Sequence, residues 1–248
     1  MPFADEAKPA PCLGGLAPHN KEFYSPDMDY IKLLLMFISA IAWSIVYISC
    51  IRIGFKQKTY CIPLWALALN FTWEVWHGFY DLHVLGPQLQ VIINAIWALF
   101  DIVILYTFFK FGRRHFPKNL KSGWFYAWGI LSLLISFLVQ YAFILEFGTV
   151  MGGSYAAFMQ NLLMSILFII MLHNRQGSEG QSLTIAYSKC IGTLAPTILF
   201  GIIGSAALNG PNISILIIGF IIFFFDLVYI VLLTRVRNLG GLLPKMNI

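Results

Sequence analysis

Three acidic residues lie within long apolar segments of the sequence, and their surroundings point to proton chemistry. Glu74 occurs in LNFTWEVWHGFYDL, Asp101 in NAIWALFDIVIL and Asp226 in IIFFFDLVYIVL, and none of these segments has a lysine or arginine in its middle. An ionised carboxylate inside a bilayer costs several kcal/mol, so intramembrane acids are candidates for function. Without a nearby cation the neutral acid is the stable form, because burial disfavours the charge. Each of the three is therefore predicted to hold a proton until a substrate accepts it.

The alternative for these acids is that each one only hydrogen-bonds a neighbouring helix. Two further acids, Asp81 and Glu146, fall at the ends of apolar segments. We interpret both as solvated, because the end of a spanning segment lies near water.

Polar and aromatic residues surround the three acids at helical spacing. Helix geometry places Asn70 and His77 on the same face as Glu74, where either could orient the carboxyl group by hydrogen bonding. Aromatic faces stabilise cations, although aromatic side chains equally fill membrane cores. The predicted binding residues are Asn70, Trp73, His77, Asn94, Trp97, Phe223 and Tyr229.

The elements that must position these residues are long apolar segments. The chain has 248 residues, of which 59% are hydrophobic and 11% charged, and its mean hydropathy is +0.77. About 20 mostly apolar residues suffice for a helix to span a bilayer. Such runs occur at roughly 30–50, 61–80, 90–111, 124–145, 151–172, 188–207 and 213–234. Runs of this length without alternation predict helices, so the expected fold is an all-α, multi-pass bundle of seven transmembrane helices.

Basic residues set the expected orientation of the bundle. They concentrate in segments 52–59 and 110–122, and Arg175, Lys189 and Arg235 fall on the same side, whereas the alternate loops have none. The positive-inside rule then places the N-terminus outside or in the lumen and the C-terminus in the cytosol. The net charge of +5 reflects this topology, and we expect no nucleic acid partner.

The same pattern divides the chain into three parts. We expect a polar, flexible N-terminal tail over residues 1–28, a seven-helix membrane domain over 29–236 and a short cytosolic tail over 237–248. The tail at 1–28 lacks the basic and then apolar layout of a signal peptide. The connecting loops are short, so any site lies among the helices.

Several classes of membrane protein fit poorly. A retinal protein needs a lysine in its last helix, and the segment 213–234 has none. Metal-dependent terpene synthases and intramembrane prenyltransferases need aspartate-rich clusters that hold magnesium and diphosphate, and no DDxxD-like run occurs. The four cysteines are scattered without metal-ligand spacing. We therefore predict no metal site.

The NFTWE sequence at 70–74, the Asn94–Trp97–Asp101 stripe and the lone Asp226 resemble the integral-membrane class II terpene cyclases. Those enzymes act in fungal meroterpenoid and indole-diterpene pathways and have bacterial relatives. The resemblance implies that Glu74 and Asp226 are the two key catalytic acids. Asp101 is added to them on its own position in the third apolar segment.

The resemblance also implies the reaction. A protonated acid donates to a terminal epoxide or alkene of a prenylated substrate, and rings close through successive carbocations shielded by aromatic faces. No cofactor is expected. The expected partners are a hydrophobic prenylated small molecule and the lipid bilayer, with no obligatory protein partner. The expected location is the endoplasmic reticulum membrane for a fungal source and the plasma membrane for a bacterial one.

Two other functions remain open from the sequence. The first is a small proton-coupled transporter that uses the buried acids as a relay, although residues 30–111 and 151–234 show no internal repeat beyond apolarity. The second is a lipid-binding or structural membrane protein, which leaves the buried acids unexplained.

Overall fold

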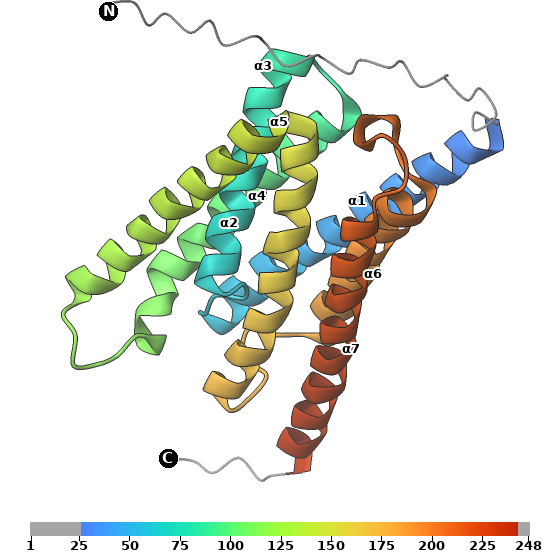
Figure 1. Ribbon diagram of the computed structural model, residues 1–248. Helices are drawn as coiled ribbons and strands as arrows, with labels where there is room; N and C mark the ends of the chain where they lie inside the picture. The colour runs from blue at the N-terminus through green and yellow to red at the C-terminus, as the bar shows by residue number, and fades with distance from the viewer. Residues whose placement is uncertain (1–25, 243–248) are drawn as a thin grey trace, which may run out of the picture.

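The structure is a computed structural model that describes residues 26–242, and the chain is helical through this range apart from short connections. Figure 1 shows the helices arranged as a bundle. Its α-helices are α1 (Pro26–Gln57), α2 (Leu64–Val75), α3 (Asp81–Leu85), α4 (Leu89–Phe111), α5 (Ser122–Arg175), α6 (Leu183–Ile198) and α7 (Ile213–Leu242). Short π or 3₁₀ turns lie between them at η2 (Trp76–Tyr80), η3 (Gly112–His115), η4 (Leu199–Ile203) and η5 (Ala206–Leu208). The all-α prediction is therefore confirmed for the described range.

Five helices in the described range are long and apolar enough to cross a membrane. They run over Asp29–Gln57, Leu89–His115, Ser122–Arg175, Leu183–Ile203 and Ile213–Leu239. The predicted count of seven is not confirmed. The predicted segment 61–80 is α2, with 12 residues, continued by η2. The predicted segments 124–145 and 151–172 both belong to α5.

Helix α5 bends sharply at Gly148, so it forms two arms. Its 54 residues include a non-helical backbone at Gly148, with φ 76° and ψ 172°. A straight helix of that length would reach about 80 Å, far more than a bilayer is thick. In Figure 1 the two arms, green and yellow, meet at the top of the bundle and both run downward.

Position 148 requires a glycine because of its backbone conformation, and not because space is lacking there. A Cβ added there would meet nothing within 4 Å, yet the positive φ strains any L side chain. We expect Gly148→Ala to lower the stability by about 1–3 kcal/mol. The matched control is Gly123→Ala near the start of the same helix, where the φ is ordinary and the added Cβ also meets nothing. Thermal unfolding of the two variants in detergent measures the difference, and equal melting temperatures would contradict this assignment.

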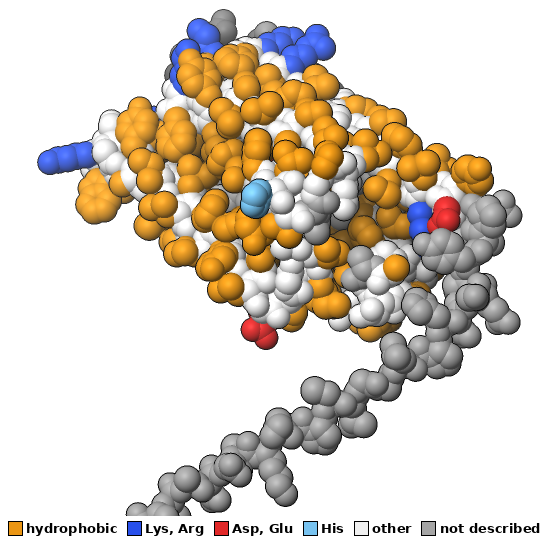
Figure 2. Space-filling view, turned by 90° about the horizontal axis from the view of Figure 1, so that it is seen from above, with side chains coloured by type: hydrophobic (Ala, Val, Ile, Leu, Met, Phe, Trp, Pro, Cys, Tyr) orange, Lys and Arg blue, Asp and Glu red, His pale blue; other side chains and the backbone are white. Residues whose placement is uncertain are grey.

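Helix α2 lies inside the bundle and brings the first acid to its centre. It packs against α4 and α5, while α1 packs against α6 and α4, and α7 packs against α6 and α5. The outer surface is apolar, with exposed side chains such as Leu34, Leu138 and Phe220. In the view from above, hydrophobic side chains cover most of the visible face (Figure 2). Such a surface suits contact with lipid chains.

One end of the bundle collects the basic loops. Arg114 forms an ion pair with Glu179, the backbone N–H of Gly180 donates to Gln57 Oε1 at 2.7 Å, and the guanidinium of Arg175 lies 4.4 Å from the Tyr60 ring centroid. Segments 57–60, 113–115 and 175–180 therefore meet at the same end, as the charge pattern predicts. Which side of the membrane this end faces stays a prediction.

The predicted tails fall largely outside the described residues. Residues 1–25 and 243–248 lie outside that range, α1 begins at Pro26, and α7 continues to Leu242. The predicted boundary at 236 thus falls inside a helix. The division into three parts otherwise stays a prediction.

Candidate active site

Glu74 and Asp101 meet at the centre of the bundle through the side chain of Asn70. Glu74 and Asn70 lie one turn apart on α2, and Asp101 reaches them from α4. The Asn70 amide nitrogen donates to Glu74 Oε1 at 2.8 Å and to Asp101 Oδ2 at 2.9 Å. All three side chains are at least 95% buried. The expected role of Asn70 as a hydrogen-bond partner of Glu74 is confirmed.

Helix α1 adds a residue that the sequence did not single out. The Tyr47 hydroxyl donates a hydrogen bond to Glu74 Oε1. Asn70 Nδ2 also lies 2.7 Å from that hydroxyl. The stretch AWSIVYISC around Tyr47 is mostly apolar and has no charged residue, so nothing in it marks this tyrosine as part of a polar cluster.

Two glutamines from α5 extend the network. Gln160 Nε2 lies 3.5 Å from Asn70 Oδ1, and Gln140 Nε2 donates to Gln160 Oε1 at 2.8 Å. These two residues come from the two arms of α5, on either side of the Gly148 bend. The bend therefore closes both arms around Asn70.

The cluster contains two carboxyl groups and no cation among its hydrogen-bond partners in the described range. Two carboxylates that share one amide donor in an apolar interior repel each other, so at least one carries its proton. Glu74 Oε2 and Asp101 Oδ1 are buried without a hydrogen-bond partner among residues 26–242. Glu74 and Asp101, which we call the carboxyl pair, can therefore supply a proton to a bound molecule.

The turn after Glu74 is a π-helix, η2, and it holds His77. His77 Nδ1 lies 2.7 Å from Asp81 Oδ2, and both side chains are more than 90% buried. Of the two residues expected as alternatives for orienting Glu74, Asn70 contacts it; the alternative through His77 is wrong, since Nδ1 of that ring faces Asp81. The interpretation of Asp81 as solvated is also wrong, because α3 continues directly from η2 and keeps that residue inside the bundle.

Two other predicted binding residues support this turn. Asn94 Nδ2 donates to the backbone oxygen of His77 at 3.2 Å. Trp73 donates from Nε1 to the backbone oxygen of Gly153 at 2.8 Å, and its ring centroid lies 4.8 Å from that of His77. Both residues therefore hold η2 against α4 and α5.

Trp97 provides an aromatic face beside the carboxyl pair. Its ring is stacked on the Tyr47 ring, with centroids 5.6 Å apart and an interplanar angle of 26°. Its Nε1 lies 3.2 Å from Ser44 Oγ. Trp97 thus joins α4 to α1 next to the residue that donates to Glu74.

Asp226 lies in a different polar group and has a basic partner. Lys189 Nζ donates to Asp226 Oδ1 at 2.7 Å and to Ser165 Oγ at 2.6 Å, and both charged side chains are about 99% buried. The prediction that the buried acids lack a cation is wrong for Asp226. The apolar run was placed at 188–207, but α6 begins at Leu183, so Lys189 lies well inside the helix and not at its edge.

The two aromatic residues predicted beside Asp226 pack in the core. Phe223 is partly buried and packs against the larger cluster of buried hydrophobic side chains in the bundle. Tyr229 is buried, its hydroxyl donates to Gln181 Oε1 at 2.9 Å, and its ring centroid lies 5.3 Å from that of Phe168. The Tyr229 hydroxyl therefore points toward the end of the bundle that carries the basic loops.

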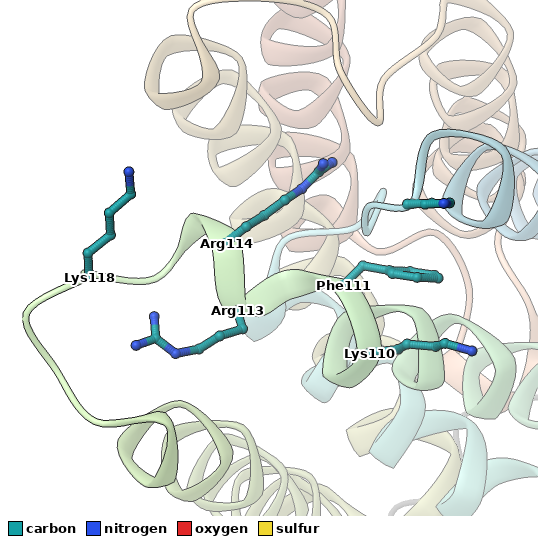
Figure 3. Close-up of a pocket in the computed structure, with 6 residues that line it drawn as sticks. Lys110, Phe111, Arg113, Arg114 and Lys118 are labelled. Carbon is teal, nitrogen blue, oxygen red and sulfur yellow. The ribbon is translucent and has the colours of Figure 1, made fainter.

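An open cavity of about 600 Å³ lies at that basic end (Figure 3). Its lining consists of Lys58, Lys110, Phe111, Arg113, Arg114 and Lys118. Five of these six lining residues carry a positive charge and would repel a carbocation. This cavity is therefore unsuited to the chemistry that the carboxyl pair allows.

The chain matches a known family of membrane proteins over most of its length. Residues 20–239 match the family model of Pyr4-like transmembrane terpene cyclases. The chain belongs to this family. It is accordingly an integral, multi-pass membrane protein, and the family supports a terpene cyclase over a transporter.

Curated relatives agree with the family match. The chain is 30% identical over 182 residues to the Pyr4-family terpene cyclase mfmH of Annulohypoxylon moriforme, which covers 71% of this chain and 73% of that protein. It is 30% identical to the terpene cyclase macJ of Penicillium terrestre, covering 66% and 64%. It is 27% identical to the asnovolin H synthase nvfL of Aspergillus novofumigatus, covering 68% and 70%. No solved structure matches the chain.

Proposed function

We propose that this terpene cyclase is of the protonation-initiated class and that the carboxyl pair starts the reaction. The observation that carries the proposal is the buried contact of Glu74 and Asp101 through Asn70, without a cation among their partners in the described range. A carboxyl group kept neutral in this way is a general acid. The substrate class is a prenylated aromatic compound of the meroterpenoid or indole-terpenoid type.

In the proposed first step Glu74 gives its proton to the terminal epoxide or alkene of the prenyl chain. For an alkene, the π electrons form the new C–H bond and leave a tertiary cation. For an epoxide, the oxygen is protonated and its C–O bond opens as the first ring closes. The carboxylate left on Glu74 is stabilised by the donors already in place, the Tyr47 hydroxyl and the Asn70 amide.

The cations that follow need a dry, electron-rich surrounding. Trp97 and Tyr47 present stacked rings beside the carboxyl pair, and Trp73 presents its indole beside His77. Phe223 and Tyr229 are proposed for the same role farther along the substrate. The proposed reaction uses no metal ion or organic cofactor.

Asp226 enters the proposal in a different role from Glu74. Its Oδ1 forms a buried ion pair with Lys189 Nζ at 2.7 Å, so we do not assign the first proton to it. Asp226 Oδ2 is buried without a hydrogen-bond partner in the described part of the chain. We assign this anion to the stabilisation of positive charge during ring closure.

For the topology we propose seven membrane crossings, with the two arms of α5 and the α2–η2 segment each crossing once. The N-terminus faces the lumen and the C-terminus faces the cytosol, because the basic loops gather at one end. The fungal relatives favour the endoplasmic reticulum membrane as the location.

Activity of the purified protein in detergent, where no ion gradient exists, tests this function. We expect the protein purified in detergent to convert a farnesylated phenol or geranylgeranylated indole, each offered with and without a terminal epoxide, into a cyclised isomer. We expect full activity in the presence of EDTA, because the proposed acid is a side chain. Mass spectrometry and NMR identify the products. Loss of activity with EDTA and recovery with added magnesium would contradict the metal-independent mechanism.

A further inference from the structure

A second buried acid–base group lies one helical turn beyond Glu74. His77 follows Glu74 by three residues, which is about 4.5 Å along a helix axis. The contact between His77 Nδ1 and Asp81 Oδ2 measures 2.7 Å. His77 and Asp81 are separate from the carboxyl pair, since none of the hydrogen bonds of Glu74 or Asp101 goes to either residue.

The contact with Asp81 determines which ring nitrogen of His77 is free to act. A carboxylate accepts hydrogen bonds, so Asp81 Oδ2 favours the tautomer with its proton on Nδ1. Nε2 then carries a lone pair. Within residues 26–242 this nitrogen is buried and has no hydrogen-bond partner. A buried polar atom without a partner costs free energy. A bound group that supplies a proton to Nε2 would remove that cost.

The surroundings of the imidazole suit a transient cation. The ring lies against the backbone of Gly153, where an added Cβ would come within 2.8 Å of Nε2. Its other neighbour is the Trp73 ring, with centroids 4.8 Å apart. An indole face stabilises both an imidazolium and a substrate carbocation.

The π-helical turn explains how His77 comes to be placed there. A π-turn inserts one extra residue per turn and often occurs at functional sites. Here it is held by the bond from Asn94 Nδ2 to the backbone oxygen of His77. Gly78 allows the close approach, since a Cβ there would lie 2.7 Å from the backbone nitrogen of Ala95.

We propose that His77 Nε2 is the base that ends the reaction, with Asp81 as its positioning residue. This inference rests on the proposed function of the carboxyl pair. In the last step a C–H bond next to the final cation breaks. Its electrons form the C=C bond of the product, and the proton goes to Nε2. The imidazolium that results is stabilised by the Asp81 carboxylate.

The proton then returns to Glu74 after the product leaves. Glu74 has lost one proton in the first step and His77 has gained one in the last, so this transfer restores both groups. The overall reaction is an isomerisation that consumes no proton. The two groups lie on successive turns of one continuous helical segment, so the transfer path is short.

Product analysis of histidine and aspartate variants tests the inference. We expect His77→Gln to keep consuming substrate, because Glu74 still starts the reaction, while the yield of the normal product falls by about 10²-fold. The remainder appears as alcohols formed by water addition and as partly cyclised compounds. Asp81→Asn removes the negative charge beside Nδ1, and we expect the same change in product ratio. His83→Gln on α3, an exposed position, serves as the matched control and keeps the normal profile.

The outcomes separate this inference from the proposed function. An unchanged product ratio in His77→Gln, with or without a lower rate, overturns the assignment of His77 as the base and leaves Glu74 as the acid. If Glu74→Gln still consumes substrate, the proposed function itself fails. If His77→Gln does not accumulate in membranes, Asp81→Asn, which keeps the histidine, decides the question in the same assay.

Discussion

Glu74→Gln is expected to abolish cyclisation while the protein still folds. The glutamine keeps the size of the side chain and an oxygen that accepts from Tyr47 and Asn70, so the polar cluster stays intact. Its amide cannot act as an acid, and we expect the rate to fall by about 10³-fold or more. Substrate consumption in membranes that contain equal amounts of each protein measures the effect.

Two comparisons sharpen this experiment. Glu146→Gln changes the same residue type at an exposed position of α5 and is expected to leave the rate unchanged. Asp101→Asn keeps Glu74 but alters its partner, so we expect an intermediate loss. Wild-type turnover by Glu74→Gln would remove the carboxyl pair from the chemistry.

Breaking the Lys189–Asp226 ion pair is expected to produce the largest change in stability. Lys189→Met leaves a carboxylate buried without a cation, and Asp226→Asn leaves an ammonium group in the same state. Removing one partner of a buried pair costs about 3–5 kcal/mol. We expect each single variant to melt far below the wild type in detergent.

The double variant Lys189→Met/Asp226→Asn is expected to recover most of the lost stability, because no unpaired charge remains. Strictly additive losses would show that the two side chains do not interact. Lys56→Met at an exposed position of α1 is the control for the lysine change. The activity of the recovered double variant also tests Asp226. If that variant cyclises substrate normally, Asp226 acts in stability alone.

The sequence predicted the helical class well because apolar length is a direct signal. The five long helices correspond to predicted apolar runs. The number of helices was harder to predict, since apolar runs look the same in one bent helix as in two separate helices. Only the backbone angles at Gly148 show that α5 bends without a loop.

The candidate site was partly predictable for a similar reason. Helix spacing linked Asn70 to Glu74, and that contact is confirmed. The approach of Asp101 depends on how α4 packs against α2, which no spacing within one helix reveals. Tyr47 and Lys189 were missed or misplaced because their partners lie on other helices. Asp81 was misplaced although its partner His77 lies four residues before it, because the apolar run was taken to end at residue 80.

The buried lysine of α6 also bears on how the protein is made. When α6 leaves the ribosome, α7 has not yet been synthesised, so Lys189 enters the translocon without its neutralising aspartate. An ammonium group at that depth opposes release into lipid. We therefore expect stable integration of α6 to follow the synthesis of the last helix. Chains that terminate before Asp226 are expected to stay with the insertion machinery and be degraded.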